Sequence, residues 1–320
     1  PTPETSAGMS DTLDIDPIHN EGGASGAGWS DIAAFLRCPK EFQLAKVRGI
    51  IKPTAATPDY FAVGSMVHAG RAAWLSRKQA MDSETDAFVA SEMARVRKEY
   101  EDKNQPVSEK AVTDAARIIR EYRDHYSMRI APRTVAVEHF IGPFTLDDAD
   151  GPEQARTGRL DDFGFYEEFG GRLAIGECKT TSGTPAQVMR EYELHGQPAL
   201  YDLLWNRAPQ GAAQYGPIAG IVFDVIQKGY GGKKCVFARI PIEVPERVKE
   251  WQRQELRAAI AQAKALQADS PARRNITACT RASGNGRVKC TFHALCMYGG
   301  AARGEYAHAD GSPLVEGDWD

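Results

Sequence analysis

The feature that most constrains this chain is a short apolar run that ends in two charged residues. Residues 173–175 are apolar and lead through Gly176 to Glu177 and Lys179. Residues i and i+2 of a strand face the same side, so these two side chains should point together, with Cys178 on the opposite face. Charges at the end of a buried strand cost free energy unless they are paired or bind a metal. The segment therefore predicts a buried strand and a polar site where it ends.

A second carboxylate is expected beside Glu177. The stretch Gly-Arg-Leu-Asp-Asp places Asp161 at the end of an apolar run, and a tight turn at residues 169–171 joins the strands of residues 155–167 and 171–180. Two converging carboxylates repel unless a divalent cation such as Mg²⁺ lies between them. A nearby lysine then suits metal-assisted hydrolysis of a phosphodiester. Taken alone, this spacing fits a surface ion pair on a hairpin better.

Helical and strand periodicities along the chain predict a mixed fold. Pro39 should interrupt the first helix just after Cys38. The expected helices cover residues 30–47, 64–79, 83–101, 108–129, 194–205 and 245–268, and the expected strands cover residues 133–140, 155–167, 171–180, 218–227 and 234–244. This order predicts an α/β (α+β) class, with a mixed central sheet flanked by helices. A helical insertion at residues 70–130 and a carboxyl-terminal region that contains the clustered cysteines complete the expectation.

Charge is distributed unevenly along the chain. The formal net charge is −4, but residues 1–27 carry five acidic and no basic residues, and residues 299–320 carry five acidic residues and one arginine. Removing these contributions of −5 and −4 leaves +5 on residues 28–298. We expect a disordered acidic tail at residues 1–27 and a second acidic tail at residues 299–320. The mildly basic body permits nucleic-acid binding, although a solvated surface of mixed charge accounts for it equally well.

Several protein classes are disfavoured by missing signals. The chain has no run of about 18 apolar residues, so no transmembrane helix is expected. Its first residues lack the basic and apolar regions of a signal peptide. No Walker-type phosphate loop is present, so ATP hydrolysis by this chain is not expected.

The chain has six cysteines, and without an export signal their clustering favours metal binding over disulfides. Cys279, Cys290 and Cys296 fall within 18 residues near the carboxyl terminus. Cys178 and Cys235 lie in strand patterns and should be core residues.

Five short motifs follow one another in the chain. They are SDIAAFLRCPKEF, VGSMVHAG with His68, GRLDD with Asp161, GECKT with Glu177 and Lys179, and GQPALY with Gln197 and Tyr201. In this order, over most of residues 28–298, they resemble the PD-(D/E)XK nuclease superfamily in its RecB-like branch. That branch includes the nuclease domains of RecB and AddB, CRISPR-associated RecB-like exonucleases and phage recombination exonucleases.

The resemblance implies a metal site. His68, Asp161, Glu177 and the backbone carbonyl of Cys178 would bind Mg²⁺ or Mn²⁺, and Lys179 would assist the attacking water. For His68 alone, a satisfied histidine near a helix amino terminus is the other interpretation. The superfamily commonly has Asp where this chain has Glu177, and both supply an oxygen ligand.

Four further residues complete the expected site or border it. The resemblance implies that Gln197 and Tyr201 position DNA or brace the site, and ordinary helix packing accounts for them almost equally well. Glu138, in an earlier strand, either joins the acidic site or binds an arginine. Asp162 should face away from Asp161, since neighbouring strand residues alternate.

The resemblance also implies a cluster that joins the two ends of the domain. Cys38, Cys279, Cys290 and Cys296 would hold a 4Fe–4S cluster, and a structural Zn²⁺ ion is the alternative. The chain departs from the family pattern because ten residues separate Cys279 from Cys290, where Cys-x2-Cys is usual. His293 is a lower-ranked substitute ligand.

The function implied is a metal-dependent DNA exonuclease that acts on ends, preferentially single strands, in recombination, repair or phage DNA processing. Expected partners are DNA and a helicase, recombination or CRISPR protein, in the cytoplasm of a bacterial or phage-infected cell, with no membrane. One alternative is a non-catalytic DNA-binding or assembly module, which usually loses a site residue. A restriction-type or partner-dependent endonuclease is the other.

A channel for the DNA strand is a further hypothesis. Trp74, Tyr122, Arg117 and Arg120 of the expected helical insertion would line it, with stacking and charge acting together. Tyr122 also fits the apolar stripe of its helix, which favours a place in the core.

Overall fold

A five-stranded mixed sheet is the centre of the computed structural model. The model describes residues 29–52, 59–103, 105–127, 132–144, 156–192, 196–229, 233–267, 269–275, 280–283, 286–316 and 318. The strand order is β2-β3-β4-β5-β6, and only the β4–β5 pair is parallel. The strands are β2 (Arg133–Phe144), β3 (Arg156–Tyr166), β4 (Arg172–Thr181), β5 (Ile221–Gln227) and β6 (Val236–Ile242). This architecture confirms the predicted fold class.

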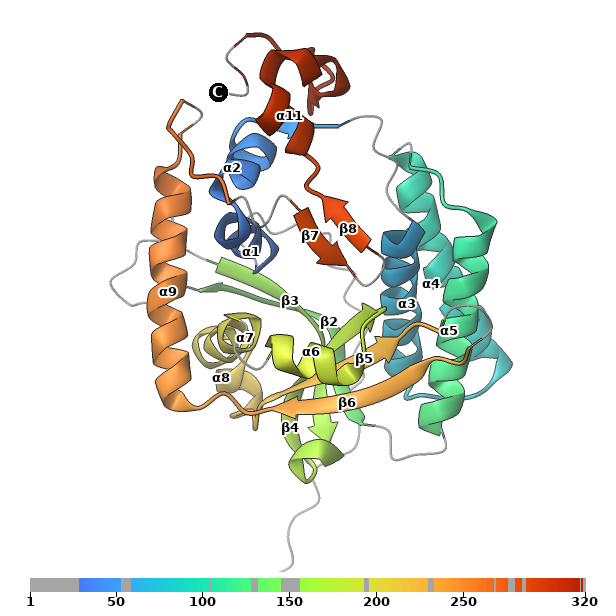
Figure 1. The fold of residues 1–320 in the computed structure, drawn as a ribbon. Helices are drawn as coiled ribbons and strands as arrows, with labels where there is room; N and C mark the ends of the chain where they lie inside the picture. The colour runs from blue at the N-terminus through green and yellow to red at the C-terminus, as the bar shows by residue number, and fades with distance from the viewer. Residues whose placement is uncertain are drawn as a thin grey trace, which may run out of the picture.

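Helices cover both faces of the sheet (Figure 1). The segments α6 (Pro185–Tyr192), α7 (Gly196–Arg207) and α8 (Ala212–Tyr215) form the crossover that a parallel strand pair requires. On one face, α1 (Trp29–Arg37), α7 and α9 (Glu246–Ala265) contribute to a core with the sheet residues Phe163, Ile175 and Phe223. On the other face, α3 (Asp59–Ser76), α4 (Ser83–Asp102) and α5 (Glu109–Ser127) pack with Cys178 and Ile226.

The β3–β4 hairpin follows the predicted strand positions closely. A short 3₁₀ turn, η3 (Glu167–Phe169), leads into Gly170 and Gly171, whose φ angles are +64° and +73°. Glycine adopts this left-handed conformation without the steric cost of a Cβ. Residues 173–178 of β4 are all buried, because helices cover the strand on both sides. The carboxyl end of β4 therefore emerges from a fully packed core.

The break at Cys38 also matches the sequence. Cys38 is extended, with a φ of −159°, and separates α1 from α2 (Pro39–Phe42). Pro39 has no backbone N–H, so it occupies the first position of a helix at no hydrogen-bond cost. The chain then continues through η1 (Gln43–Val47) into β1 (Ile50–Ile51).

Segments from near the two ends of the described chain pack together at one pole of the molecule, where Leu44 of η1 and Leu295 of α11 share a core cluster (Figure 1). After β7 (Thr280–Ser283) and β8 (Gly286–Lys289), the chain forms α11 (His293–Tyr298), η4 (Gly299–Glu305) and β9 (Ala307–His308), and β9 pairs with β1. Tyr306 and Leu314 are buried against Leu44 and Ile50. Much of the expected acidic tail at residues 299–320 thus belongs to the folded part, because its few apolar side chains have a core to join. The expected tail at residues 1–27 lies outside the described residues.

None of the helices in the described ranges is long and apolar enough to cross a membrane.

Candidate active site

A chain of hydrogen bonds connects the end of β4 to α7. Lys179 Nζ lies 2.6 Å from Glu177 Oε1 and 3.2 Å from Gln197 Oε1. Gln197 Nε2 donates to Glu177 Oε1 at 2.7 Å and lies 2.9 Å from the Tyr201 hydroxyl. The Glu-x-Lys spacing places both charged side chains on the α7 face of the sheet, as the strand period requires. Four of the predicted site residues are thereby in one network.

Asp161 and His68 adjoin this network from β3 and α3. The β3–β4 register ends with the pair Asp162 and Gly176, so Asp161 is released from the ladder. Its Oδ2 accepts a hydrogen bond of 2.7 Å from the backbone N–H of Cys178 and lies 3.5 Å from Nδ1 of His68. Strand β3, strand β4 and helix α3 thus bring Asp161, Cys178 and His68 together, and the motif order predicts this proximity of His68 and Asp161.

The two carboxyl groups of the site have opposite electrostatic environments. Burial raises the pKa of Asp161, but His68, Lys179 and Arg71 together outweigh burial and leave this pKa well below its usual range. Burial and the Asp161 charge raise the pKa of Glu177, and Lys179 offsets only part of that increase. Like charges held close together in a buried place produce this divergence. Asp161 is therefore ionised at neutral pH. The ionised form of Glu177, by contrast, is disfavoured by its surroundings.

The cationic side chains respond to these carboxylates. Burial lowers the pKa of Lys179, but Glu177, Tyr192 and Asp161 together more than compensate, so that Lys179 is protonated at neutral pH. Burial also lowers the pKa of His68, and the Cys178 sulfur and Asp161 outweigh it, so the net pKa lies well above the usual value. Lys179 is consequently a hydrogen-bond donor and a positive charge rather than a base.

A second polar cluster, which the sequence did not reveal as a unit, lies behind the site. Arg71 Nη1 is 2.7 Å from Asp162 Oδ2, and Arg71 Nε is 3.0 Å from Asp224 Oδ2. All three side chains are at most 1% exposed. Tyr166 donates to Asp162, and Asp224 also interacts with Tyr122, Tyr126 and Arg239. We call Arg71, Asp162, Asp224, Tyr122, Tyr126, Tyr166 and Arg239 the buried ion cluster.

The buried ion cluster fixes the orientation of α3. Arg71 follows His68 by three residues, so both side chains project from neighbouring positions on one helix face. Arg71 pairs with Asp162 while His68 lies near Asp161, the preceding residue of β3. Asp162 faces away from Asp161, as predicted. A signal was present in the sequence: Asp224 interrupts the apolar run of β5, and such a charge needs a buried partner.

Comparison with known protein families agrees with this geometry. A model of the PD-(D/E)XK nuclease superfamily matches residues 29–297. The chain belongs to the PD-(D/E)XK nuclease superfamily. Members of this superfamily are nucleases, which hydrolyse phosphodiester bonds, and they typically use Mg²⁺ or Mn²⁺. A search of curated proteins gives no match.

The residues of this PD-(D/E)XK site fit a divalent cation in their chemistry. Glu177 Oε2 is buried and has no hydrogen-bond partner, which leaves a carboxylate oxygen unsatisfied beside Asp161. A hard cation prefers such oxygen ligands and would cancel the repulsion that raises the pKa of Glu177. Within the described ranges, no three His, Cys, Asp or Glu side chains already form a metal-binding group. Glu177 Oε1 and Asp161 Oδ2 already have protein partners, so cation binding at these atoms requires a small rearrangement.

Glu138 borders the site on a strained segment of β2. Its φ is +49°, where the β2–β3 register passes from Val137 directly to His139. Arg159 Nε lies 2.9 Å from Glu138 Oε2, which agrees with the arginine-binding interpretation. Burial and the nearby Asp161 charge also raise the pKa of Glu138. Both interpretations of this residue therefore have a structural basis.

Gly176 has a steric role in the Gly-Glu-x-Lys motif. A Cβ at this position would overlap the Tyr166 hydroxyl and the Asp162 carboxylate. The absence of a side chain lets Tyr166 and Asp162 of the buried ion cluster pack directly against β4 at the residue before Glu177.

The predicted DNA channel is wrong for its two aromatic residues. Trp74 and Tyr122 are fully buried and contribute to the core between α3 and α5. Arg117 pairs with Glu121 at 2.7 Å and donates to the carbonyl of Gly229. An apolar stripe on a helix that faces a sheet is core, so these rings have no surface to offer a nucleobase.

Two cysteines lie in the core, as expected, and three others lie in the segments near the two ends of the described chain. Cys178 and Cys235 are buried with the α3–α5 helices. Cys290 and Cys296 pack against the cluster that contains Leu44 of η1. Cys38 is buried, and its Sγ lies 3.5 Å from the backbone N of Asn275. Cys279 lies outside the described residues.

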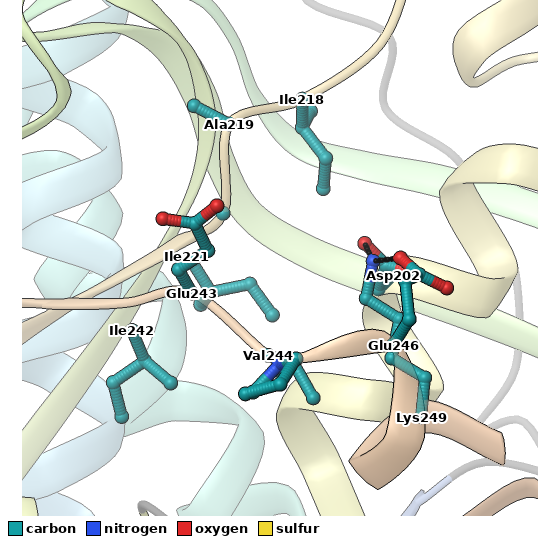
Figure 2. A pocket seen from close by; sticks show the side chains of 11 residues that line it. Asp202, Ile218, Ala219, Ile221, Ile242, Glu243, Val244, Glu246 and Lys249 are labelled. Carbon is teal, nitrogen blue, oxygen red and sulfur yellow. Dashed lines mark hydrogen bonds and ion pairs between the residues drawn. The ribbon is translucent and has the colours of Figure 1, made fainter.

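A separate hollow of about 400 Å³ lies at the other end of the sheet. Ile221, the first residue of β5, lines it, as do Asp202, Val244 and Lys249 (Figure 2). Lys249 Nζ pairs with Asp202 at 3.1 Å and with Glu246 at 2.8 Å. Lys249 is therefore in contact with carboxylates from two helices, α7 and α9. The hollow shares no residue with the Asp161–Glu177–Lys179 site.

Proposed function

We propose that this PD-(D/E)XK protein is a metal-dependent DNA exonuclease that acts on the ends of single strands. The observation that supports it most is the unsatisfied Glu177 Oε2 beside Asp161, with a protonated Lys179 bonded to the same carboxylate. This combination suits a reaction in which negative charge builds up on a phosphate. Asp161, Glu177, His68 and the Cys178 carbonyl are the proposed ligands.

Each residue of the site would have a defined task. A bound Mg²⁺ or Mn²⁺ ion supplies Lewis-acid activation of the phosphodiester. Lys179 holds the attacking water and stabilises the developing charge by donating hydrogen bonds. Gln197 bonds both Lys179 and Glu177, so it fixes their relative orientation. Tyr201 in turn holds Gln197 in place.

The RecB-like assignment rests on the motif order and on the cysteines. Cys38 interacts with the backbone of Asn275, four residues before Cys279 in the sequence. Cys290 and Cys296 pack beside η1, which follows Cys38 by a few residues. These contacts link the segments around Cys38, Cys290 and Cys296 and support the proposal that, together with Cys279, they would hold a 4Fe–4S cluster, with Zn²⁺ as the alternative. We infer an activity in recombination, repair or phage DNA processing, with a helicase or recombination partner.

A nuclease assay on end-labelled DNA tests the proposal. Linear single strands, linear duplexes and closed single-stranded circles are incubated with Mg²⁺ or Mn²⁺, and with EDTA as the metal-free control. Lys179→Ala is the inactive variant. Lys249→Ala is a matched control, because Lys249 is equally shielded, with 20% of its side chain exposed against 23% for Lys179, and also pairs with carboxylates.

The expected result is metal-dependent degradation of linear single strands that Lys179→Ala abolishes and Lys249→Ala retains, while circles stay intact. Cleavage of circles would replace the exonuclease with an endonuclease. DNA binding without cleavage would favour the non-catalytic module. Cleavage that survives Lys179→Ala would contradict the site assignment.

The metal cluster has its own test. A protein purified without oxygen should absorb near 400 nm and contain iron and sulfide, and Cys38→Ser should lose both. Stoichiometric zinc without iron would replace the iron–sulfur cluster with a structural zinc ion.

A further inference from the structure

Two exposed aromatic rings stand at the beginning of α3. Tyr60 is 48% exposed and Phe61 is 54% exposed, with their ring centroids 4.5 Å apart. The rest of α3 is a core helix, with ten of its 18 residues buried. Burying apolar area stabilises a protein by about 25 cal/mol per Å², so a neighbouring pair of exposed rings points to a surface that another molecule covers.

Phe61 of the ring pair lies on the same face of α3 as the proposed metal ligand His68. Phe61, Gly64 and His68 have the spacing i, i+3 and i+7, which defines one helical stripe. At 1.5 Å per residue, Phe61 precedes His68 by about 10 Å along the helix axis. Midway along the stripe, a Cβ at Gly64 would lie 3.1 Å from Thr180 Oγ1, so α3 closely approaches β4 just past Lys179. The stripe therefore leads from the aromatic rings to the site.

A lysine connects the same rings to the end of β4. The backbone N–H of Lys228 donates to the carbonyl of Thr181 at 2.8 Å, two residues past Lys179. The Nζ atom of Lys228 lies over the Tyr60 ring, 6.0 Å from the ring centroid. Two neighbouring aromatic rings, inclined to each other by 35°, and a positive charge thus lie together near the carboxyl ends of β4 and β5. Both strands end beside α3 (Figure 1).

We propose that Tyr60 and Phe61 form a stacking platform for the bases of single-stranded DNA, with Lys228 attracting the adjacent phosphate. This inference rests on the proposed nuclease function and adds the part of the surface that holds the strand. Aromatic side chains stack on any unpaired base, and a cation beside them follows the backbone. A duplex keeps its bases stacked inside, so only an unpaired strand offers faces to these rings.

Binding to two oligonucleotides of equal length isolates the stacking. Fluorescence anisotropy in EDTA, where cleavage is absent, measures the dissociation constants of labelled oligothymidylate and of an abasic oligomer with the same phosphates. The test variant is Tyr60→Ala with Phe61→Ala. Trp251→Ala is the matched control, because Trp251 is also an exposed ring, with 47% of its surface accessible, but lies on α9. Circular dichroism verifies that each variant is folded.

The wild-type protein should bind oligothymidylate roughly tenfold or more tightly than the abasic oligomer. This ratio should fall to about one in the double alanine variant and stay unchanged in Trp251→Ala. A second variant, Tyr60→Leu with Phe61→Leu, keeps apolar area without flat rings and should also lose the preference. Lys228→Ala should instead lower the slope of log affinity against log salt by about 0.7, the value for one phosphate contact on a single strand.

An unchanged ratio in the double alanine variant would overturn the platform, as would an equal loss in Trp251→Ala or no binding to oligothymidylate by the wild-type protein. Absence of cleavage in Mg²⁺ with a normal ratio would instead contradict the nuclease function and leave the platform intact. The binding and cleavage assays thus separate the two failures.

Discussion

Gln197 Nε2 donates a hydrogen bond to Glu177 Oε1 over 2.7 Å, and both side chains are almost fully buried. The same Gln197 lies within hydrogen-bond distance of Lys179 and Tyr201. A glutamine with three such contacts has little freedom to reorient. It therefore connects the end of strand β4 to the helix α7.

Replacing Gln197 with alanine should lower kcat more than it raises KM for DNA. The change leaves Glu177 and Lys179 with one fewer partner in a buried place, which costs about 1–3 kcal/mol and corresponds to roughly 5- to 150-fold in rate. Steady-state kinetics on a labelled single strand measure this. Asn206→Ala, on the same helix but exposed, is the control and should be near wild type. Equal rates for both variants would assign Gln197 to packing alone.

Glu177→Gln should stabilise the metal-free protein at neutral pH. The pKa of Glu177 is raised in the folded state by burial and by Asp161, so its ionisation costs folding free energy. That cost grows as the pH rises through the folded pKa and is absent below the unfolded value of about 4.3. Urea unfolding in EDTA at pH 7.5 and at pH 4 measures the difference. The variant should gain stability at pH 7.5 and match the wild type at pH 4.

A cation should reverse that order. Mn²⁺ at 100 times its dissociation constant would stabilise the wild-type protein by about 2.7 kcal/mol, while Glu177→Gln gains much less because it lacks the charged ligand. Thermal unfolding with and without Mn²⁺ gives this comparison independently of cleavage. Equal stabilisation of both proteins would place the cation elsewhere.

The sheet and most of the site were predictable because local signals agree there. The apolar run before Glu177, the turn glycines and the strand period together specify β4 and the direction of Lys179. The motif order then identified His68 and Asp161 as neighbours across more than 90 residues, and the structure places them 3.5 Å apart.

Features that depend on tertiary pairing were not predictable. Arg71, Asp162 and Asp224 come from three separate elements, and nothing in their spacing states that they meet. The predicted channel was wrong for Trp74 and Tyr122. Both are aromatic residues of the kind that stack on nucleobases, but they lie on the core-facing sides of α3 and α5. The burial of Tyr306 and Leu314 was not predicted, because these two residues lie in an acidic segment with few apolar side chains.

Gly176→Ala should destabilise the fold and lower activity together. The new methyl group would overlap the Tyr166 hydroxyl and the Asp162 carboxylate, and overpacking of a core typically costs about 1–3 kcal/mol. Gly304→Ala is the matched control, because a Cβ at Gly304 meets nothing within 4 Å. Urea unfolding should separate the two variants clearly. An unchanged free energy of unfolding for Gly176→Ala would mean that the side chains of the buried ion cluster can move aside at little cost.

Arg71→Met should be among the most destabilising single changes in the chain. It removes the cation that pairs with Asp162 at 2.7 Å and Asp224 at 3.0 Å, and the stranded charges cost about 3–5 kcal/mol in the free energy of unfolding. Arg95→Ala, whose side chain is 50% exposed and pairs with Glu92, should cost less than about 1 kcal/mol.

Neutralising the stranded carboxylates separates charge from packing. Adding Asp162→Asn and Asp224→Asn to Arg71→Met should recover much of the lost stability, because the buried charges are then gone. Activity should stay low, since His68 loses the neighbour that orients α3 against β3. Urea unfolding and the single-strand cleavage assay on the same proteins test both parts. Full recovery of activity with stability would show that the buried ion cluster serves stability alone.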